Sequence, residues 1–220
     1  MNTFDNIIEK LKKEYDREDI LCFFITGSVA RGEAYEGNDL DALFVTKNDS
    51  FHKEYREGKS LLEISGNTFH SYMEALEKNP MLVYMYMDAR AIFAKDDSLE
   101  KLKQKAEEIL KNYKSSEEER QAIKKWLASV VDKVAVAKEH EDNLKVGFHI
   151  SNVVWKVVEG FYAINNAPVP ASTSALRRIT NLSRKPDNFE ELWRKTLLGT
   201  LEERTEATMQ LMKFILTELS

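Results

Sequence analysis

The chain of 220 residues is long enough for one large domain or two small ones. Its formal net charge of −5 argues against binding of long DNA or RNA, which needs a basic surface. The same charge is compatible with a small substrate. No apolar run approaches the roughly 18 residues that span a bilayer. The N-terminus lacks the features of a secretory signal, and the single cysteine, Cys22, excludes an internal disulfide. We therefore expect a cytoplasmic protein without a membrane partner.

The first half of the chain mixes helix and strand patterns. Apolar residues at helical spacing predict a helix over 4–15. An apolar run predicts a buried strand over 20–26, and after a glycine-bearing turn a second strand is predicted over 40–46. The other elements expected in this half are a strand over 60–65, a helix over 70–78, a strand over 89–97 and a helix over 99–114.

The second half, from about residue 115, shows helical periodicity with almost no strand signal. The helices predicted there cover 116–140, 143–165, 173–184 and 188–218. The predicted fold is therefore an α/β (α+β) domain with a mixed sheet over residues 1–114, followed by an all-helical bundle domain over 115–220.

The large aromatic and methionine side chains are expected to pack in the cores or between domains, rather than to form a platform on which a base stacks. They are Trp126, Trp155, Tyr162, Trp193 and the run from Met81 to Met87. At least one of them could instead line a substrate pocket.

The most informative feature is a pair of acids, Asp39 and Asp41, on either side of Leu40. Alternate residues of a strand share a face, so the two carboxylates point the same way and repel each other. That arrangement persists most easily where a cation, usually Mg²⁺, lies between them. The pair therefore predicts a metal site.

A turn rich in small residues, Thr26-Gly-Ser-Val-Ala-Arg-Gly32, precedes the acid pair. Small residues let a backbone approach a phosphate closely, and the N–H groups and the Ser28 hydroxyl offer hydrogen-bond donors. The turn is thus a candidate phosphate site, and an ordinary tight turn is the alternative.

Together these two segments carry a resemblance to a known family. Gly27-Ser28, then ten residues, then Asp39-Leu40-Asp41 inside an apolar strand resembles the signature of the DNA polymerase β-like nucleotidyltransferase superfamily. This superfamily includes the aminoglycoside and lincosamide nucleotidyltransferases and the minimal nucleotidyltransferases of toxin–antitoxin pairs. Ala30-Arg31-Gly32 strengthens the match, and Asn38 stands where many relatives carry serine.

The resemblance implies an enzyme that moves an NMP from ATP or another NTP to an acceptor hydroxyl and releases pyrophosphate. It also implies two Mg²⁺ ions held by Asp39, Asp41 and a third acid on a neighbouring strand. Glu63 matches the third acid, because it is the only acid embedded in the apolar strand over 60–65. A solvent-facing residue on an edge strand is the alternative for Glu63.

The candidate nucleotide-binding residues begin in the turn. The resemblance implies contacts from Gly27 and Ser28 to the β- and γ-phosphates. Arg31 is a candidate bidentate donor to phosphate. It is equally suited to cap a local helix or to bind Glu33 or Glu36.

Three candidates lie in the helical half. Arg177 and Arg178 close a segment whose helix N-terminus could attract an anion, and pairing with acids of neighbouring helices is the alternative for both. Glu159 is an acid within an apolar helix, which is costly without a partner. It is a candidate general base toward the acceptor, with Glu74 and Glu77 as competitors, and pairing with Lys156 or an arginine is the alternative.

The leading hypothesis is a Mg²⁺-dependent nucleotidyltransferase that adenylylates a hydroxyl of a small molecule such as an antibiotic, with the helical domain selecting the acceptor. The alternative is an antitoxin-like or regulatory nucleotidyltransferase that modifies a protein partner. The helical half lacks an Arg-x-x-x-x-His nuclease motif, which counts against that alternative. A third hypothesis is a nucleotide-binding module that has lost activity. The presence of all three acids, Asp39, Asp41 and Glu63, argues against it. Whether the chain forms a homodimer stays open.

Overall fold

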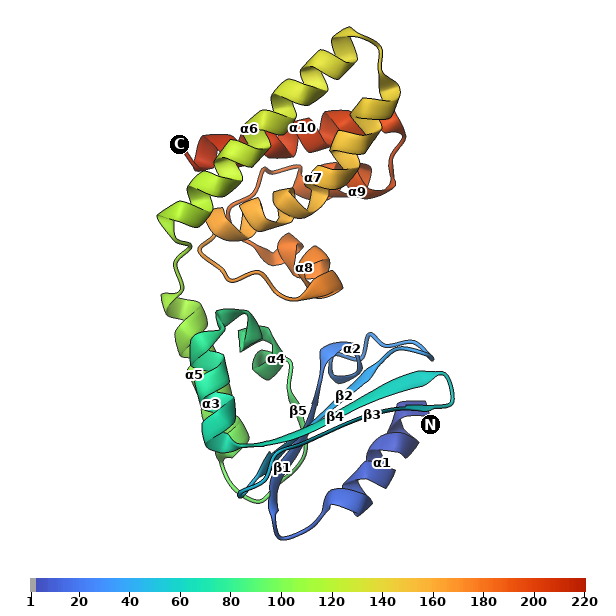
Figure 1. The fold of residues 1–220 in the computed structure, drawn as a ribbon, viewed down its shortest axis with the longest axis vertical. Helices are drawn as coiled ribbons and strands as arrows, with labels where there is room; N and C mark the ends of the chain where they lie inside the picture. Colours follow the sequence, from blue (N-terminus) through green and yellow to red (C-terminus); the bar gives the residue numbers. More distant parts are fainter. Residues whose placement is uncertain (1–2) are drawn as a thin grey trace. The chain divides into compact units, whose positions relative to one another are not determined.

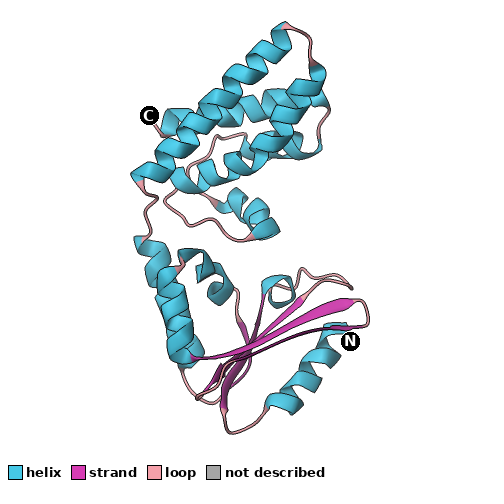
Figure 2. Ribbon diagram, in the orientation of Figure 1, coloured by secondary structure: helices cyan, strands magenta, loops and turns pink. Residues whose placement is uncertain are grey.

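The computed structural model describes residues 3–220, apart from the side chains of residues 3, 172 and 173. The chain divides into two compact units, one ending at Asn112 and the next beginning at Tyr113. The strands lie in the first unit, and the described part of the second is built from helices (Figure 2). The predicted fold class, a mixed sheet with helices followed by a helical region, is confirmed.

The first unit alternates helices and strands. In chain order its elements are α1 (Thr3–Tyr15), β1 (Ile20–Thr26), α2 (Gly27–Ala30), β2 (Leu40–Thr46), β3 (Phe51–Glu57), β4 (Ser60–Thr68), α3 (Phe69–Lys78), the 3₁₀ turn η1 (Pro80–Leu82), α4 (Val83–Met87), β5 (Arg90–Ala94) and α5 (Ser98–Asn112).

The five strands form one mixed sheet in the order β3-β4-β2-β1-β5 (Figure 1). β1 pairs antiparallel with β2 and β5, and the β3–β4 hairpin turns at Gly58, whose φ is +61°. Because this hairpin reverses the chain, β4 runs parallel to β2 and starts at the same end of the sheet. Residues near the starts of β2 and β4 therefore lie side by side.

Each face of the sheet carries its own hydrophobic core, because successive strand residues point to opposite faces. The core under α1 includes Phe4, Leu11, Phe23, Ile25 and Phe44. The core on the other face, which joins α3, α4 and α5 to the sheet, includes Phe24, Tyr72, Val83, Tyr86 and Leu102. Figure 1 shows α1 on one side of the sheet and α3 and α5 on the other.

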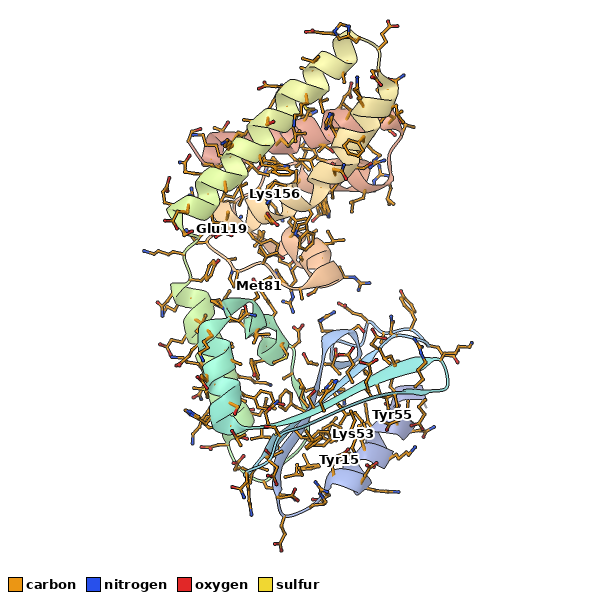
Figure 3. All side chains as sticks on the ribbon, in the orientation of Figure 1. Tyr15, Lys53, Tyr55, Met81, Glu119 and Lys156 are labelled. Carbon is orange, nitrogen blue, oxygen red and sulfur yellow. The ribbon has the colours of Figure 1, made fainter. Side chains whose placement is uncertain are left out.

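The strand β3 is absent from the prediction, because residues 51–57 are mostly charged and lack the apolar pattern of a buried strand. Lys53 and Tyr55 lie on the α1 side, where Lys53 Nζ donates to the Tyr15 hydroxyl at 2.9 Å (Figure 3). Glu54, between them in the strand, therefore faces the opposite side of the sheet. β3 is an edge strand, and its charges discourage pairing with other chains.

The segment between α3 and β5 also differs from the prediction, since η1 and α4 form where no element is expected. Packing in the core is confirmed for Val83 and Tyr86, which are fully buried. Met81 and Met87, at the ends of the same run, are 44% and 41% exposed, so they lie outside the core of this unit.

The second unit contains five helices and one 3₁₀ turn in its described residues. They are α6 (Glu117–Glu139), α7 (Asn143–Ile164), α8 (Ser172–Arg178), the 3₁₀ turn η2 (Ile179–Asn181), α9 (Phe189–Leu198) and α10 (Leu201–Glu218).

Two of the predicted helices are shorter in the structure. The helix predicted over 173–184 ends as a helix at Arg178, and the backbone becomes extended at Leu182. The helix predicted over 188–218 is interrupted after α9. There the Thr200 side chain caps α10 in a capping box with Glu203. The apolar pattern continues through this break, which is why the periodicity alone does not reveal it.

An apolar core lies between helices α6, α7, α9 and α10. Within it, α10 packs closely against α7. A Cβ atom at Gly160 would lie 2.8 Å from Ile215 Cγ2, so the absence of a side chain at Gly160 permits this approach. Arg120 Nη1 donates to the Ala163 carbonyl at 3.1 Å and so ties α6 to the end of α7. In the described part of the chain, no helix is long and apolar enough to cross a bilayer.

The aromatic residues of this unit divide into two groups. Tyr162 and Trp193 are buried, as predicted, whereas Trp126 and Trp155 are 55% and 41% exposed. These two tryptophans lie outside the core of this unit, and their packing between domains stays a prediction. A helix turns about 100° per residue, so Trp126 lies to one side of its buried neighbour Leu127, and its ring centroid is 5.7 Å from Lys156 Nζ of α7.

Candidate functional site

Four side chains form a row across the sheet, on the face opposite α1. Thr26 of β1 pairs with Asp41 of β2, Asp41 pairs with Glu63 of β4, and Glu63 pairs with Glu54 of β3. Neighbouring strands lie about 4.8 Å apart, and paired residues point to the same face. The sheet therefore sets the Asp41 and Glu63 carboxylates beside each other. β4 lies inside the sheet, so the alternative of an edge-strand position for Glu63 is wrong.

The turn after β1 passes directly against Asp41. Gly27 has a φ of +69°, and a Cβ at this position would lie 2.6 Å from Asp41 Oδ2. Glycine tolerates both the conformation and the close approach. Gly27 opens α2, where the Ser28 carbonyl accepts from the Glu33 N–H at 2.9 Å and closes the turn. The Ser28 side chain itself is half-buried.

Asp41 shows the effect of crowded negative charge. Burial, followed by the carboxylates of Glu63 and Asp39, raises the pKa of Asp41 from 3.8 to about 6, and Arg31 acts in the opposite direction. The three acids singled out in the sequence thus share one electrostatic environment. A divalent cation would relieve their repulsion, and carboxylate oxygens are ligands that Mg²⁺ accepts.

Asp39 lies just before β2 and is exposed. The turn that delivers it is closed by Asn38, whose Oδ1 accepts from the Tyr35 N–H at 2.6 Å. Among residues 3–220, no group of three His, Cys, Asp or Glu side chains has the arrangement of a metal site. The three acids are thus of a chemical type that binds Mg²⁺, but they are not arranged as a complete metal site, and Asp39 lies outside the sheet.

Arg31 follows α2 and forms two ion pairs. Its Nη1 lies 2.7 Å from Asp88 Oδ2, and its Nε lies 3.0 Å from Glu33 Oε2. The alternative of an ion pair with Glu33 is thus confirmed, and Asp88 is a partner that the sequence did not suggest. Hydrogen bonds to both carboxylates outweigh burial, which would lower the pKa of Arg31, so the pKa is raised.

A family model described as "Nucleotidyltransferase domain" matches residues 5–155, well over half of the chain. The chain belongs to the nucleotidyltransferase family. It is therefore a transferase enzyme, and its family uses nucleoside triphosphates. The matched region extends beyond the first unit through α6 and into α7.

Two solved structures resemble this nucleotidyltransferase at low identity. A nucleotidyltransferase-like protein from Exiguobacterium sibiricum is 14% identical, with 97% of this chain and 74% of that chain covered and a TM-score of 0.39. A spectinomycin adenyltransferase from Enterococcus faecialis, solved with ATP and spectinomycin, is 13% identical, with 99% of both chains covered and a TM-score of 0.32. No curated protein matches the chain.

The second unit of the nucleotidyltransferase holds the remaining predicted site residues. Glu159 is half-buried on α7 and pairs with Lys156, one turn earlier on the same helix, as the alternative interpretation expects. Arg178 Nε donates to Ser174 Oγ at 3.1 Å within α8. Arg177 is exposed. The side chains of Ser172 and Thr173, at the start of the predicted anion site, lie outside the described part of the chain.

Two residues beside the acids, Glu54 and Asp88, are not predicted from the sequence, and Thr26 is predicted only as part of the glycine turn. Thr26 and Glu54 join the row through strand pairing, and Asp88 reaches Arg31 from 57 residues away. A signal existed for Glu54 alone, because Phe51 and Tyr55 occupy positions on one face of a strand and leave Glu54 on the other. No local pattern connects Asp88 with the turn.

Proposed function

We propose that this nucleotidyltransferase uses Mg²⁺ to transfer AMP from ATP to a hydroxyl group of a small molecule. The observation that carries the proposal is the pairing of Asp41 with Glu63 on adjacent parallel strands, beside the glycine turn. Asp41, with its pKa raised by burial and by the neighbouring carboxylates, belongs to a concentration of negative charge that a bound cation would stabilise.

In the proposed reaction the acceptor hydroxyl oxygen attacks the α-phosphorus of the triphosphate. The bond from this phosphorus to the bridging oxygen breaks, pyrophosphate leaves, and the hydroxyl proton passes to a base. Bound divalent ions would stabilise the charge that develops on the attacking and leaving oxygens. Asp39, Asp41 and Glu63 would hold the ions.

The turn is assigned to the triphosphate on this proposal. The close approach of Gly27 to Asp41 brings the backbone of the turn next to the proposed metal ligands. Gly27 and Ser28 would therefore contact the β- and γ-phosphates while the acids act on the α-phosphate side. Arg31 would donate to a phosphate oxygen from the far end of α2.

The two units receive different roles. Residues 1–114 are proposed as the catalytic domain, and 115–220 as the domain that selects the acceptor and supplies Glu159 as a candidate base. Arg177 and Arg178 stay candidates for phosphate contact. The net charge of −5 supports a small acceptor over a long nucleic acid, and a cationic acceptor would be attracted to the carboxylates.

A second candidate acceptor is a hydroxyl group on a protein. The observation in its favour is the set of large apolar side chains exposed on α6 and α7, since exposed apolar surface is common where proteins bind one another. Those side chains are Trp126, Val136, Leu144, Phe148 and Trp155.

The test is pyrophosphate release by the purified protein with Mg²⁺ and each NTP, against small molecules with hydroxyl groups and against candidate proteins. Asp41→Asn and Glu63→Gln should each lower turnover at least about a thousandfold, since each removes charge from the reacting centre. Glu54→Gln is the matched control, because Glu54 pairs with Glu63 but is exposed on the edge strand. It should change turnover less than about twofold.

The outcomes separate the candidates. Transfer to a small molecule supports the first proposal, and labelling of a protein alone favours the second. Normal turnover in Asp41→Asn, or a loss in Glu54→Gln as large as that in Glu63→Gln, contradicts the assignment of the acids.

A further inference from the structure

Polar contacts connect both ends of the glycine turn to the same short helix, α4. Before the turn, the Thr26 hydroxyl donates to the Met85 carbonyl at 2.8 Å. After it, Arg31 Nη1 lies 2.7 Å from Asp88 Oδ2. The two contacts enclose Gly27, so the position of the turn over Asp41 depends on where α4 lies.

Helix α4 is well suited to serve as a fixed support. Val83 and Tyr86 are fully buried in the core on the same face of the sheet as the acids. The Tyr86 ring contacts Phe24 of β1 and Tyr72 of α3, with ring centroids 6.3 Å away in both cases. Close packing of this kind leaves little freedom for the helix to shift.

The position of Asp88 is unfavourable for α4 itself. Asp88 is the C-cap residue, where the last carbonyl groups of the helix repel a carboxylate. Its side chain is only 11% exposed, and the ion pair with Arg31 offsets the cost of burying this charge. Glu33, the second carboxylate on Arg31, is 34% exposed and comes from the turn itself.

We propose that Asp88 is a positioning residue, which holds the Arg31 guanidinium in the orientation that binds the triphosphate. The inference rests on the proposed function, in which Arg31 and the turn contact the phosphates. A guanidinium has five N–H donors in a rigid plane, so a carboxylate on Nη1 orients the donors that remain. Because Asp88 and Glu33 are also negative, Arg31 contributes oriented donors to the turn rather than net positive charge.

Removal of the Asp88 charge should therefore weaken NTP binding. In Asp88→Asn the KM for ATP should rise about tenfold while kcat changes less than about twofold, because Arg31 contacts the phosphates alike before and during the reaction. Asp88→Glu keeps the charge and should recover part of the loss. The control is Asp97→Asn, which changes an exposed aspartate that lies just before α5 and pairs with Lys101, and which should change neither constant.

A double-mutant cycle distinguishes positioning from a purely structural role. If Asp88 acts through Arg31, then Asp88→Asn should have no further effect on the KM for ATP in an Arg31→Gln background. Equal effects with and without Arg31 would overturn the proposal. A lower KM in Asp88→Asn would also overturn it, because Asp88 would then compete with phosphate for Arg31.

Direct titration of Mg·ATP into the same variants keeps this inference separate from the proposed function. A wild-type protein that binds Mg·ATP but transfers nothing contradicts the proposed reaction, and the cycle in binding constants still tests Asp88. Weaker binding in Asp88→Asn that disappears in the Arg31→Gln background supports the inference. Unchanged binding in Asp88→Asn refutes it.

Discussion

The two units of this nucleotidyltransferase place close contacts at glycines for opposite purposes. In the sheet unit, Gly27 brings the backbone against the charged Oδ2 of Asp41, whereas in the helical unit Gly160 brings α7 against the apolar side chain of Ile215. The first contact lies at a polar site, where the repulsion between the Asp41, Glu63 and Asp39 carboxylates lowers the stability of the fold. The second fills an apolar core. The same methyl group, added at each glycine, should therefore affect activity in one unit and stability in the other.

Among the glycine substitutions, the largest effect is expected from Gly27→Ala, which should reduce turnover about a hundredfold. A side chain at this position meets Asp41 Oδ2 at 2.6 Å and must displace either the turn or the carboxylate, and shifts of about 1 Å at reacting groups have effects of this size. Steady-state pyrophosphate release measures the loss.

The matched control for this change is Gly32→Ala. Gly32 has a φ of +72°, close to that of Gly27, but a Cβ there would meet no atom within 4 Å. Gly32→Ala therefore introduces the same backbone strain without the collision. Equal losses of turnover in the two variants would show that strain, rather than the contact with Asp41, is responsible.

Gly160→Ala should destabilise the helical unit by about 1–2 kcal/mol. A Cβ lies 2.8 Å from Ile215 Cγ2, and the resulting overpacking exceeds the gain in helix propensity. Tryptophan fluorescence during urea unfolding reports this unit selectively, because all three tryptophans of the chain lie after residue 112.

The corresponding control on the same helix is Gly147→Ala. Its Cβ would lie an ordinary 3.5 Å from Leu201 Cδ1, so the gain in helix propensity should dominate and raise stability by up to about 1 kcal/mol. A stability loss in Gly147→Ala similar to that in Gly160→Ala would contradict the packing explanation.

The pH dependence of stability should also differ between the units. The pKa of Asp41 is raised to about 6 in the folded state from 3.8, so folding favours its protonated form. The contribution of Asp41 to the free energy of unfolding is fully present below about pH 3.8. It is lost as the pH rises through about 6. The loss should be on the order of 1–2 kcal/mol after allowance for solvent access.

Thermal unfolding followed by far-UV circular dichroism between pH 4 and 7.5 measures this effect. Asp41→Asn should remove the pH-dependent loss, and Mg²⁺ should reduce it in the wild-type protein. The transition seen by tryptophan fluorescence should not share this pH dependence. A wild-type protein and an Asp41→Asn variant with parallel pH profiles would contradict the assignment.

The smallest effect is expected in the core beside α4. The Tyr86 hydroxyl is buried and has no hydrogen-bond partner among the described residues, so Tyr86→Phe should stabilise the sheet unit by up to about 1 kcal/mol. Tyr72→Phe is the contrasting change, because the Tyr72 hydroxyl donates to the Ser65 carbonyl at 3.3 Å. Tyr72→Phe should lower stability. The denaturant midpoint should therefore rise in Tyr86→Phe and fall in Tyr72→Phe, and a fall in both variants would contradict the prediction for Tyr86.

The agreement between prediction and structure is uneven for physical reasons. β1 and β2 have their predicted ends, because both are apolar strands with a turn directly beside them. β3 is missed because its charged residues form a strand only with β4 as a partner. The boundary between α9 and α10 is missed because the apolar periodicity runs through it.

Local chemistry is enough to identify the acid pair and the glycine turn, since alternation along a strand and the small residues of a turn are properties of neighbouring residues. The roles of Asp39, Asp41 and Glu63 as metal ligands stay predictions. The adjacency of Asp41 and Glu63 comes from the parallel pairing of β2 with β4, and that of Arg31 and Asp88 comes from the docking of α4. These contacts join residues far apart in the chain, and only packing around shared cores brings such residues together.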